Sequence, residues 1–144
     1  MWLDRWVPDY VVGITRGGLT PANLISQYLD RPMETLKVSL RGLEHDCESN
    51  LWMQEDATGG KNILIVDDIN DSGDTLNWIR DDWSCHTQWG QNVRVAVLYD
   101  NESSESQHTP DYTAENINKA ADPCWIVFPW EEWWRKWNPD EQHT

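Results

Sequence analysis

Residues 63–76 read ILIVDDINDSGDTL, and this stretch decides the fold. It begins with four apolar, β-favouring residues, as in a central parallel strand that is buried on both faces. Two acids follow, and a Ser-Gly turn then leads into a helix that we expect over residues 75–83. Because a buried strand passes directly into a helix, the sequence predicts an α/β domain with a mostly parallel sheet flanked by helices.

The same alternation continues on both sides of this stretch. Strands are expected at 10–15, 34–40, 92–99 and 125–128, with one helix after residue 18 and another opened by Pro129 and running to 137. The polar residues 41–60 are interpreted as a long mobile loop, which is often functional in a compact domain. The 144 residues 1–144 are then a single domain, ending in a Trp-rich segment at 120–137.

The charge balance limits the classes of partner. The chain has 11 Lys and Arg against 25 Asp and Glu, a formal net charge of −14. Nucleic acids and anionic membranes need a basic face, so neither is expected as a partner. No run approaches the ~20 apolar residues of a membrane span. The three cysteines have no metal-ligand spacing, which favours a reduced, cytoplasmic protein.

The acids and the turn after residue 66 predict a divided site. Ligands of parallel sheets lie beyond the carboxyl ends of the strands. There, the pair Asp67 and Asp68 suits sugar hydroxyls or a hydrated Mg²⁺ ion. The backbone amides of a helix N-terminus, with the hydroxyls of Ser72 and Thr75, suit a phosphate. An equally good reading of Ser72 and Asp74 is that they only cap the helix.

The stretch 63–76 resembles the phosphoribosyl pyrophosphate (PRPP) signature of the type I phosphoribosyltransferases, and within them the bacterial xanthine-guanine (6-oxopurine) enzymes. The shared pattern is four apolar residues, two acids, two variable residues and Asp-Ser/Thr-Gly-x-Thr. The resemblance extends from about Tyr10 to Glu131. It implies a Mg²⁺-dependent enzyme of purine salvage that transfers ribose 5-phosphate from PRPP to guanine, xanthine or hypoxanthine. A homo-oligomer, a dimer or tetramer, is also expected.

The resemblance assigns roles around the acidic stretch. Asp71 matches the catalytic general base, and Asp67 and Asp68 would hold the ribose hydroxyls and the Mg²⁺ shell. The residues implied to bind PRPP are Asp67, Asp68, Asp71, Ser72, Gly73, Asp74 and Thr75. Asp74 departs from the family, which often has a small residue there, so its carboxylate has to point away from the phosphate.

A second match covers the turn after the first strand. The residues Thr15, Arg16, Gly17 and Gly18 resemble the pyrophosphate loop of the family. The chemistry agrees with that role, because two glycines let the backbone approach an anion and Arg16 offers a forked cationic donor.

The third match places a small base-binding region near the C-terminus. Trp125 would stack on the purine, and Ile126 would lie beside it. The family has a Lys that donates to the purine O6, but Asp100 stands at that position, and an ionised carboxylate cannot donate. The next basic residue after Arg94 is Lys119, and we expect no near neighbour to substitute. Asp100 leaves two alternatives open: a preference for amino-purines, or a non-catalytic PRPP- or nucleotide-binding regulator.

Overall fold

The computed structural model describes residues 4–40, 46–47, 50–83, 91–106 and 108–134. Its elements, in chain order, are β1 (Tyr10–Thr15), α1 (Leu19–Leu29), β2 (Met33–Ser39), β3 (Asp46–Cys47), α2 (Leu51–Thr58), β4 (Ile63–Asn70), α3 (Asp74–Trp83), β5 (Val93–Asn101) and β6 (Tyr112–Ile117). None of the helices in these ranges is long and apolar enough to cross a membrane.

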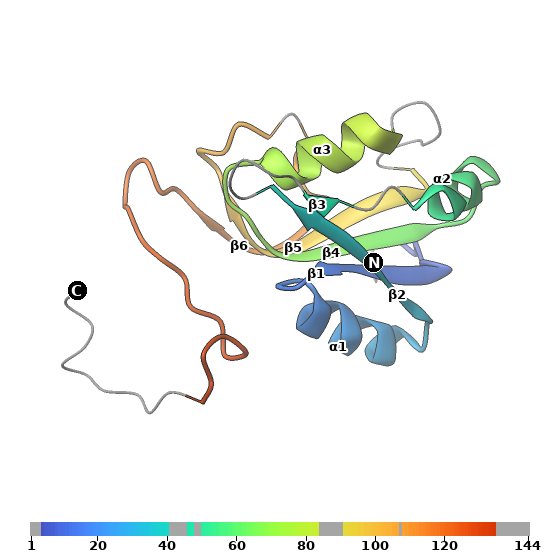
Figure 1. Ribbon diagram of the computed structural model, residues 1–144, viewed down its shortest axis with the longest axis horizontal. Helices are drawn as coiled ribbons and strands as arrows, with labels where there is room; N and C mark the ends of the chain where they lie inside the picture. The colour runs from blue at the N-terminus through green and yellow to red at the C-terminus, as the bar shows by residue number, and fades with distance from the viewer. Residues whose placement is uncertain (1–3, 41–45, 48–49, 84–90, 107, 135–144) are drawn as a thin grey trace.

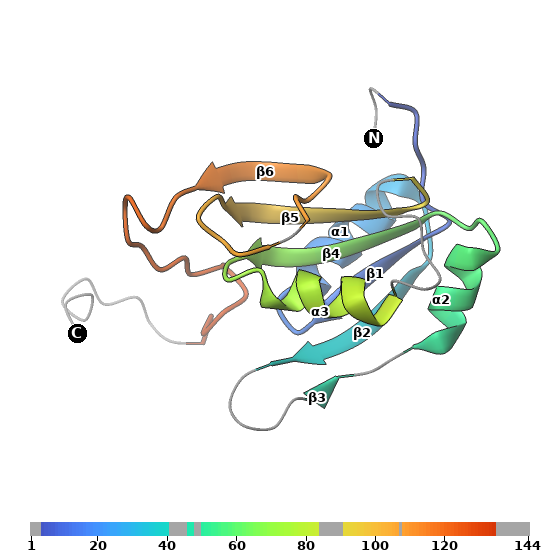
Figure 2. The ribbon, with the colours of Figure 1, turned by 90° about the horizontal axis from the view of Figure 1, so that it is seen from above.

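The strands form one sheet in the order β3-β2-β1-β4-β5-β6 (Figure 2). The five strands β1, β2, β4, β5 and β6 are all parallel to their neighbours, and the short β3 adds to β2 in the antiparallel sense. The predicted mostly parallel sheet is confirmed. β4 lies between β1 and β5, which explains why its run of four apolar residues is completely buried.

Helices cover both faces of the sheet: α1 lies on one face, and α2 and α3 lie on the other (Figure 1). Successive side chains of a strand point to opposite faces. Accordingly, Ile63 and Ile65 of β4 belong to the core under α2 and α3, whereas Leu64 and Val66 belong to the core beside α1. Because β4 is packed between the two cores, the side chains at its carboxyl end are held in place.

The prediction of a loop at 41–60 is wrong for residues 46–47 and 51–58, because these residues form β3 and α2. Met53 and Ala57, one helical turn apart, are buried against the core, while Leu51 and Trp52 stay exposed. With only one short buried stripe, α2 has almost no amphipathic signal in the sequence, and tertiary packing decides its conformation. Residues 41–45 and 48–49 lie outside the described residues.

The C-terminal expectations also need correction. Residues 112–117 form the strand β6, which the sequence did not predict, because its YTAENI pattern is polar and half-exposed at the sheet edge. Residues 118–134, here called the C-terminal arm, contain turns and irregular backbone, with neither the strand expected at 125–128 nor the start of the helix expected from 129. Residues 135–137 lie outside the described residues. The arm leaves the end of β6 and extends away from the sheet (Figure 1).

Candidate active site

The two turns singled out in the sequence lie side by side at the carboxyl edge of the sheet. β1 and β4 are adjacent and parallel, so the turn after Thr15 meets the end of β4. β4 continues to Asn70, which places both Asp67 and Asp68 inside the strand. These acids therefore point to different surroundings.

Asp67 and Asp68 are not equivalent carboxylates. Asp67 is 9% exposed, and its Oδ1 accepts the backbone N–H of Asp68 at 2.9 Å. Burial, and then the neighbouring carboxylate of Asp68, hold the pKa of Asp67 well above its usual range. Asp68 is half-buried, and its Oδ1 accepts the N–H of Ile69 at 2.7 Å. Of the expected pair, Asp68 is thus the acid that is more accessible to a ligand.

The residues 71–75, here called the Ser-Gly turn, connect β4 to α3. The hydroxyl of Ser72 accepts the N–H of Asp74 at 3.3 Å, which is the capping interaction considered from the sequence. The amides of Thr75 and Leu76 lie in the first helical turn and have no acceptor within the helix. The turn therefore combines a cap with free N–H groups that can receive an anion.

Gly73 permits this geometry. Its φ is +92°, and a Cβ there would lie 2.4 Å from the backbone nitrogen of Ser106. The connection between β5 and β6 covers the turn at this point, because the N–H of Glu105 donates to the carbonyl of Ser72 at 3.0 Å. A side chain at position 73 would require a strained backbone conformation and would clash with Ser106.

We expect Gly73→Ala to destabilise the protein more than Gly60→Ala does. Both glycines have a φ of +92°, but a Cβ at Gly60 meets nothing within 4 Å. Left-handed backbone costs an alanine about 1–2 kcal/mol at either position, and the clash with Ser106 adds about 1–3 kcal/mol at Gly73. Urea unfolding of both variants measures the difference. Equal losses would contradict the packing role.

The turn after β1 is pressed against β4. A Cβ at Gly17 would lie 2.3 Å from the carboxylate Oδ2 of Asp68, and one at Gly18 would lie 2.3 Å from the carbonyl of Val66. The Thr15–Arg16 peptide bond is cis, and Arg16 is exposed. The glycines thus have a packing reason that the sequence did not reveal, and the packing brings the turn directly beside Asp68.

Asp71 is held by two residues from other parts of the chain. The amide of Asn101 donates to the carbonyl oxygen of Asp71 at 3.0 Å and to its Oδ1 at 3.4 Å. The Nζ of Lys119 lies 2.9 Å from its Oδ2. The Asp71 side chain remains 43% exposed, so a ligand can reach it.

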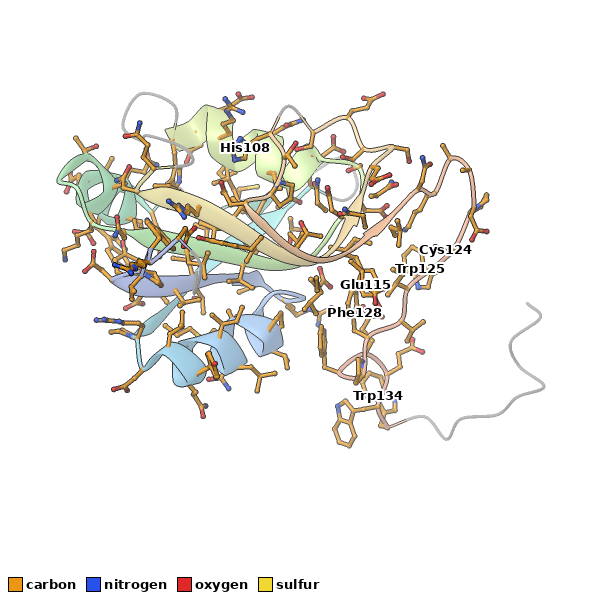
Figure 3. All side chains as sticks on the ribbon, turned by 180° about the vertical axis from the view of Figure 1, so that it is seen from behind. His108, Glu115, Cys124, Trp125, Phe128 and Trp134 are labelled. Atoms are coloured by element: carbon orange, nitrogen blue, oxygen red, sulfur yellow. The ribbon has the colours of Figure 1, made fainter. Side chains whose placement is uncertain are left out.

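The C-terminal arm brings aromatic side chains to this edge. Trp125 is 76% exposed, and the Nζ of Lys119 lies 5.5 Å from the centroid of its ring. Phe128 is buried, lies 5.9 Å from the ring of Tyr99 and stacks on Trp130 at 4.9 Å. Figure 3 shows Trp125 and Phe128 on the part of the arm nearest the sheet, and Trp134 at its far end. Phe128 anchors the arm, and Trp125 offers an open aromatic face.

Comparison with known proteins identifies the family of the chain. Residues 3–136 match the family described as the phosphoribosyl transferase domain. The chain belongs to the phosphoribosyltransferase family. The Ser-Gly turn, the acids of β4 and the turn after β1 are the parts that the resemblance in the sequence had indicated.

Individual relatives of this phosphoribosyltransferase agree. A xanthine-guanine phosphoribosyltransferase of Cereibacter sphaeroides is 32% identical over 138 residues, which cover 90% of this chain and 75% of the relative. One of Roseobacter denitrificans is 32% identical over 143 residues, with 90% and 74% covered. Among solved structures, a purine phosphoribosyltransferase of Pyrococcus horikoshii superposes with a TM-score of 0.64 at 28% identity, covering 87% of this chain and 78% of that one.

Asp100 does not join the other expected base-binding residues of the phosphoribosyltransferase. It is buried, and its Oδ1 accepts the side-chain amide of Asn70 at 2.8 Å. Both side chains line a cavity of about 460 Å³ under the β5–β6 connection, together with Ser104, His108, Thr113 and Asn116. The neighbouring Tyr99, which contacts Phe128 of the arm, points to the opposite face of the strand. Through Lys119, the structure therefore brings Trp125 to the site edge without Asp100, and Ile126 follows Trp125 in the arm as a half-buried residue.

Two residues of the site escaped the sequence: Asn101 and Lys119. Lys119 is 48 residues away from Asp71 along the chain. The two meet because the unpredicted strand β6 runs parallel to β5 and returns the chain to the same sheet edge. Predicting β6 would have revealed this contact, because β6 places residue 118 and the residues after it beyond the carboxyl ends of the strands.

Proposed function

We propose that this phosphoribosyltransferase transfers ribose 5-phosphate from PRPP to a 6-oxopurine, with guanine, xanthine and hypoxanthine as the candidate bases, and releases pyrophosphate. The observation that carries the proposal is the arrangement at the end of β4: Asp68, Asp71 and the Ser-Gly turn lie in sequence on one edge, beside the turn after β1. The xanthine-guanine relatives support the class of base.

Different residues of the site act on different parts of the substrate. The free amides of the Ser-Gly turn suit the 5′-phosphate, and Asp68 suits the ribose hydroxyls. Positive charge develops on the ribose as the bond to pyrophosphate breaks, and the carboxylates of Asp68 and Asp71 favour that charge. Arg16 and the backbone at Gly17 receive the leaving pyrophosphate. Asp71 is exposed enough to accept the proton that the purine nitrogen loses when it attacks C1.

The donor set fits a magnesium ion that is carried mainly by the substrate. No group of three acidic, His or Cys side chains that could hold a metal occurs in the part of the chain that the structure describes. Mg²⁺ characteristically uses one or two carboxylates together with water and substrate phosphates. Asp68 supplies such a carboxylate, with Asp67 behind it. When bound, the ion would offset the negative charge of the pyrophosphate group.

We expect the enzyme to convert PRPP with hypoxanthine, guanine or xanthine into the corresponding monophosphate, and to lose this activity when a chelator removes Mg²⁺. The protein itself carries a net charge of −14, which opposes an anionic substrate, so the metal dependence should be steep. Chromatography of the products for these bases and for adenine measures both effects.

Two other outcomes have defined meanings. If adenine or 2,6-diaminopurine reacts and the 6-oxopurines do not, the amino-purine alternative holds. If PRPP binds but no base reacts, the non-catalytic regulator alternative holds. A calorimetric titration with PRPP, with and without Mg²⁺, distinguishes a regulator from a protein that fails to bind PRPP.

A homo-oligomer also remains a proposal. Val127, Trp133 and Trp134 of the C-terminal arm are each at least 66% exposed, and large apolar side chains in one exposed segment are typical of interaction surfaces. Light scattering of the purified protein measures its mass in solution. The cytoplasmic location stays a prediction from the cysteines.

A further inference from the structure

We propose that Asn101 is a positioning residue of the reaction: its buried side-chain amide, at the end of β5, holds the main chain and the carboxylate of Asp71 in the orientation in which Asp71 accepts a proton. The inference deepens the proposed function and rests on it, because it takes Asp71 as the general base. Asn101 acts through Asp71 and is not itself a catalytic residue.

Asn101 is a rigid support, because its backbone and its side chain are both bonded. It is 6% exposed and pairs with Ile117 of β6. Its carbonyl oxygen accepts the N–H of Ser104 at 2.8 Å. Its side-chain Oδ1 accepts the N–H of Lys119 at 3.1 Å and the hydroxyl of Ser103 at 2.7 Å. A side chain that is fixed at so many points can hold a neighbour in place.

The chemistry of these partners decides which way the amide points. The backbone N–H groups of Ser103 and Lys119 can only donate, so the amide oxygen faces them, at 3.2 and 3.1 Å. The amide nitrogen then faces Asp71, whose main-chain carbonyl it contacts at 3.0 Å and whose Oδ1 it contacts at 3.4 Å. A carboxylate at position 101 would offer oxygens to both sides, and an apolar side chain would bond to neither. The amide satisfies the donors and the acceptors together.

The restraint matters because Asp71 is not held by burial. Its side chain is 43% exposed, and an acid with that freedom can turn among several rotamers. Asn101 contacts the Oδ1 of Asp71, and the Nζ of Lys119 lies 2.9 Å from the Oδ2. A carboxylate has about four acceptor sites, so these two contacts leave room for the proton of the purine nitrogen. A general base has to lie within hydrogen-bond distance of the proton it takes, and a fixed orientation keeps it there.

A second asparagine–aspartate pair on the same edge of the sheet provides a matched control. Asn70 is 3% exposed, and its side-chain amide donates to the Oδ1 of Asp100 at 2.8 Å. The two pairs have the same chemistry, and both asparagines lie at the ends of neighbouring strands. Only one of the two acceptors, Asp71, belongs to the proposed catalytic site. The pairs therefore separate an effect on the base from a general effect on this edge.

The test compares Asn101→Asp with Asn70→Asp. Asn101→Asp keeps an acceptor for the two backbone N–H groups but turns a second carboxylate oxygen towards Asp71, which repels it. We expect kcat to fall roughly 10- to 100-fold, since a small displacement of a reacting group costs a rate factor of that size. KM for PRPP should change much less, because the N–H of Glu105 also holds the Ser-Gly turn. Asn70→Asp should lower the melting temperature similarly and keep kcat within a few-fold of the wild type.

The background of Asp71→Asn gives a readout that a merely structural asparagine would not move. The base is already absent there, so adding Asn101→Asp should lower kcat little further. Losses that multiply in the double variant overturn the inference, as does an unchanged kcat in Asn101→Asp or an equal loss of kcat in Asn70→Asp. If Asn101→Asp does not fold, Asn101→Ala and Asn70→Ala, which remove the amides without adding a charge, replace the pair in the same comparison.

Failure of the proposed function has a different signature. If the wild type turns over none of the bases, the proposed function fails, and urea unfolding of the same proteins decides whether Asn101 holds Asp71. A destabilisation by Asn101→Asp that becomes much smaller in the Asp71→Asn background supports the contact, because an amide at position 71 can donate to the carboxylate at position 101. An equal destabilisation in both backgrounds rejects it.

Discussion

Asp71→Ala is expected to lower the turnover rate by roughly 10²-fold or more, the usual contribution of a general base. The carboxylate is exposed at the end of β4, is oriented by Asn101 and Lys119, and lies on the edge that also carries the Ser-Gly turn. Its loss removes the acceptor for the proton of the purine nitrogen. Steady-state kinetics with saturating PRPP and base measures the effect, and Asp81→Ala, an exposed acid of α3, serves as the control.

A second variant separates proton transfer from structure. Asp71→Asn keeps the size of the side chain and an oxygen for the Asn101 amide, but it lacks the charge and the basicity. We expect it to be as slow as Asp71→Ala, with melting behaviour close to that of the wild type. If both variants turn over at the wild-type rate, Asp71 has no part in catalysis.

Asp67→Asn is expected to stabilise the protein at neutral and alkaline pH. The pKa of Asp67 is raised in the folded state, first by burial and second by the carboxylate of Asp68. The favourable contribution of this carboxyl is therefore complete below its unfolded value of about 4 and is lost as the pH rises through its folded-state pKa. An asparagine is neutral at every pH. The melting temperature of Asp67→Asn near pH 8 should therefore exceed that of the wild type by roughly 4 °C or more, which corresponds to a gain of about 1 kcal/mol in the free energy of unfolding.

Comparison with Asp68→Asn makes this prediction specific. That substitution relieves only the second cause, because the burial of Asp67 remains, so the gain in melting temperature should be smaller. It should weaken PRPP binding instead, since Asp68 is the acid that faces the turn after β1. Melting curves of the three proteins from about pH 5 to about pH 8 decide the matter. Parallel curves for the wild type and Asp67→Asn would show that Asp67 does not titrate differently in the folded state.

The sequence predicts the parts of the fold in which burial and local preference agree. β1, α1, β2, β4, α3 and β5 all combine a clear period with clear ends, and each is found within a few residues of its expected bounds. α2 and β6 lack this agreement. α2 buries only a short stripe of side chains. β6 is a polar edge strand, and its extended conformation depends on its pairing with β5. The opposite error occurs at 125–128, where an apolar WIVF pattern suggests a strand, but these residues have irregular backbone and pair with none of the described strands.

The candidate site follows the same division. The acids and the Ser-Gly turn are contiguous in the chain, so a motif finds them. Asn101 and Lys119 are brought to Asp71 by the tertiary structure, and no local pattern marks them. The difference between Asp67 and Asp68 is likewise invisible in the sequence, because it comes from the burial of one carboxyl in the centre of the sheet.

The irregular backbone of the C-terminal arm has a consequence for how such an enzyme can diverge. The residues that handle sugar and anion belong to β4 and to the turns against it, where a changed side chain disturbs the two cores. Lys119 and Trp125 belong to a segment of irregular backbone that contacts the body of the domain through Phe128 and through the bonds of Lys119 to Asp71 and Asn101. Mutations in that segment carry little folding cost, so selection can exchange one nucleobase for another while the machinery for ribose and pyrophosphate is inherited unchanged.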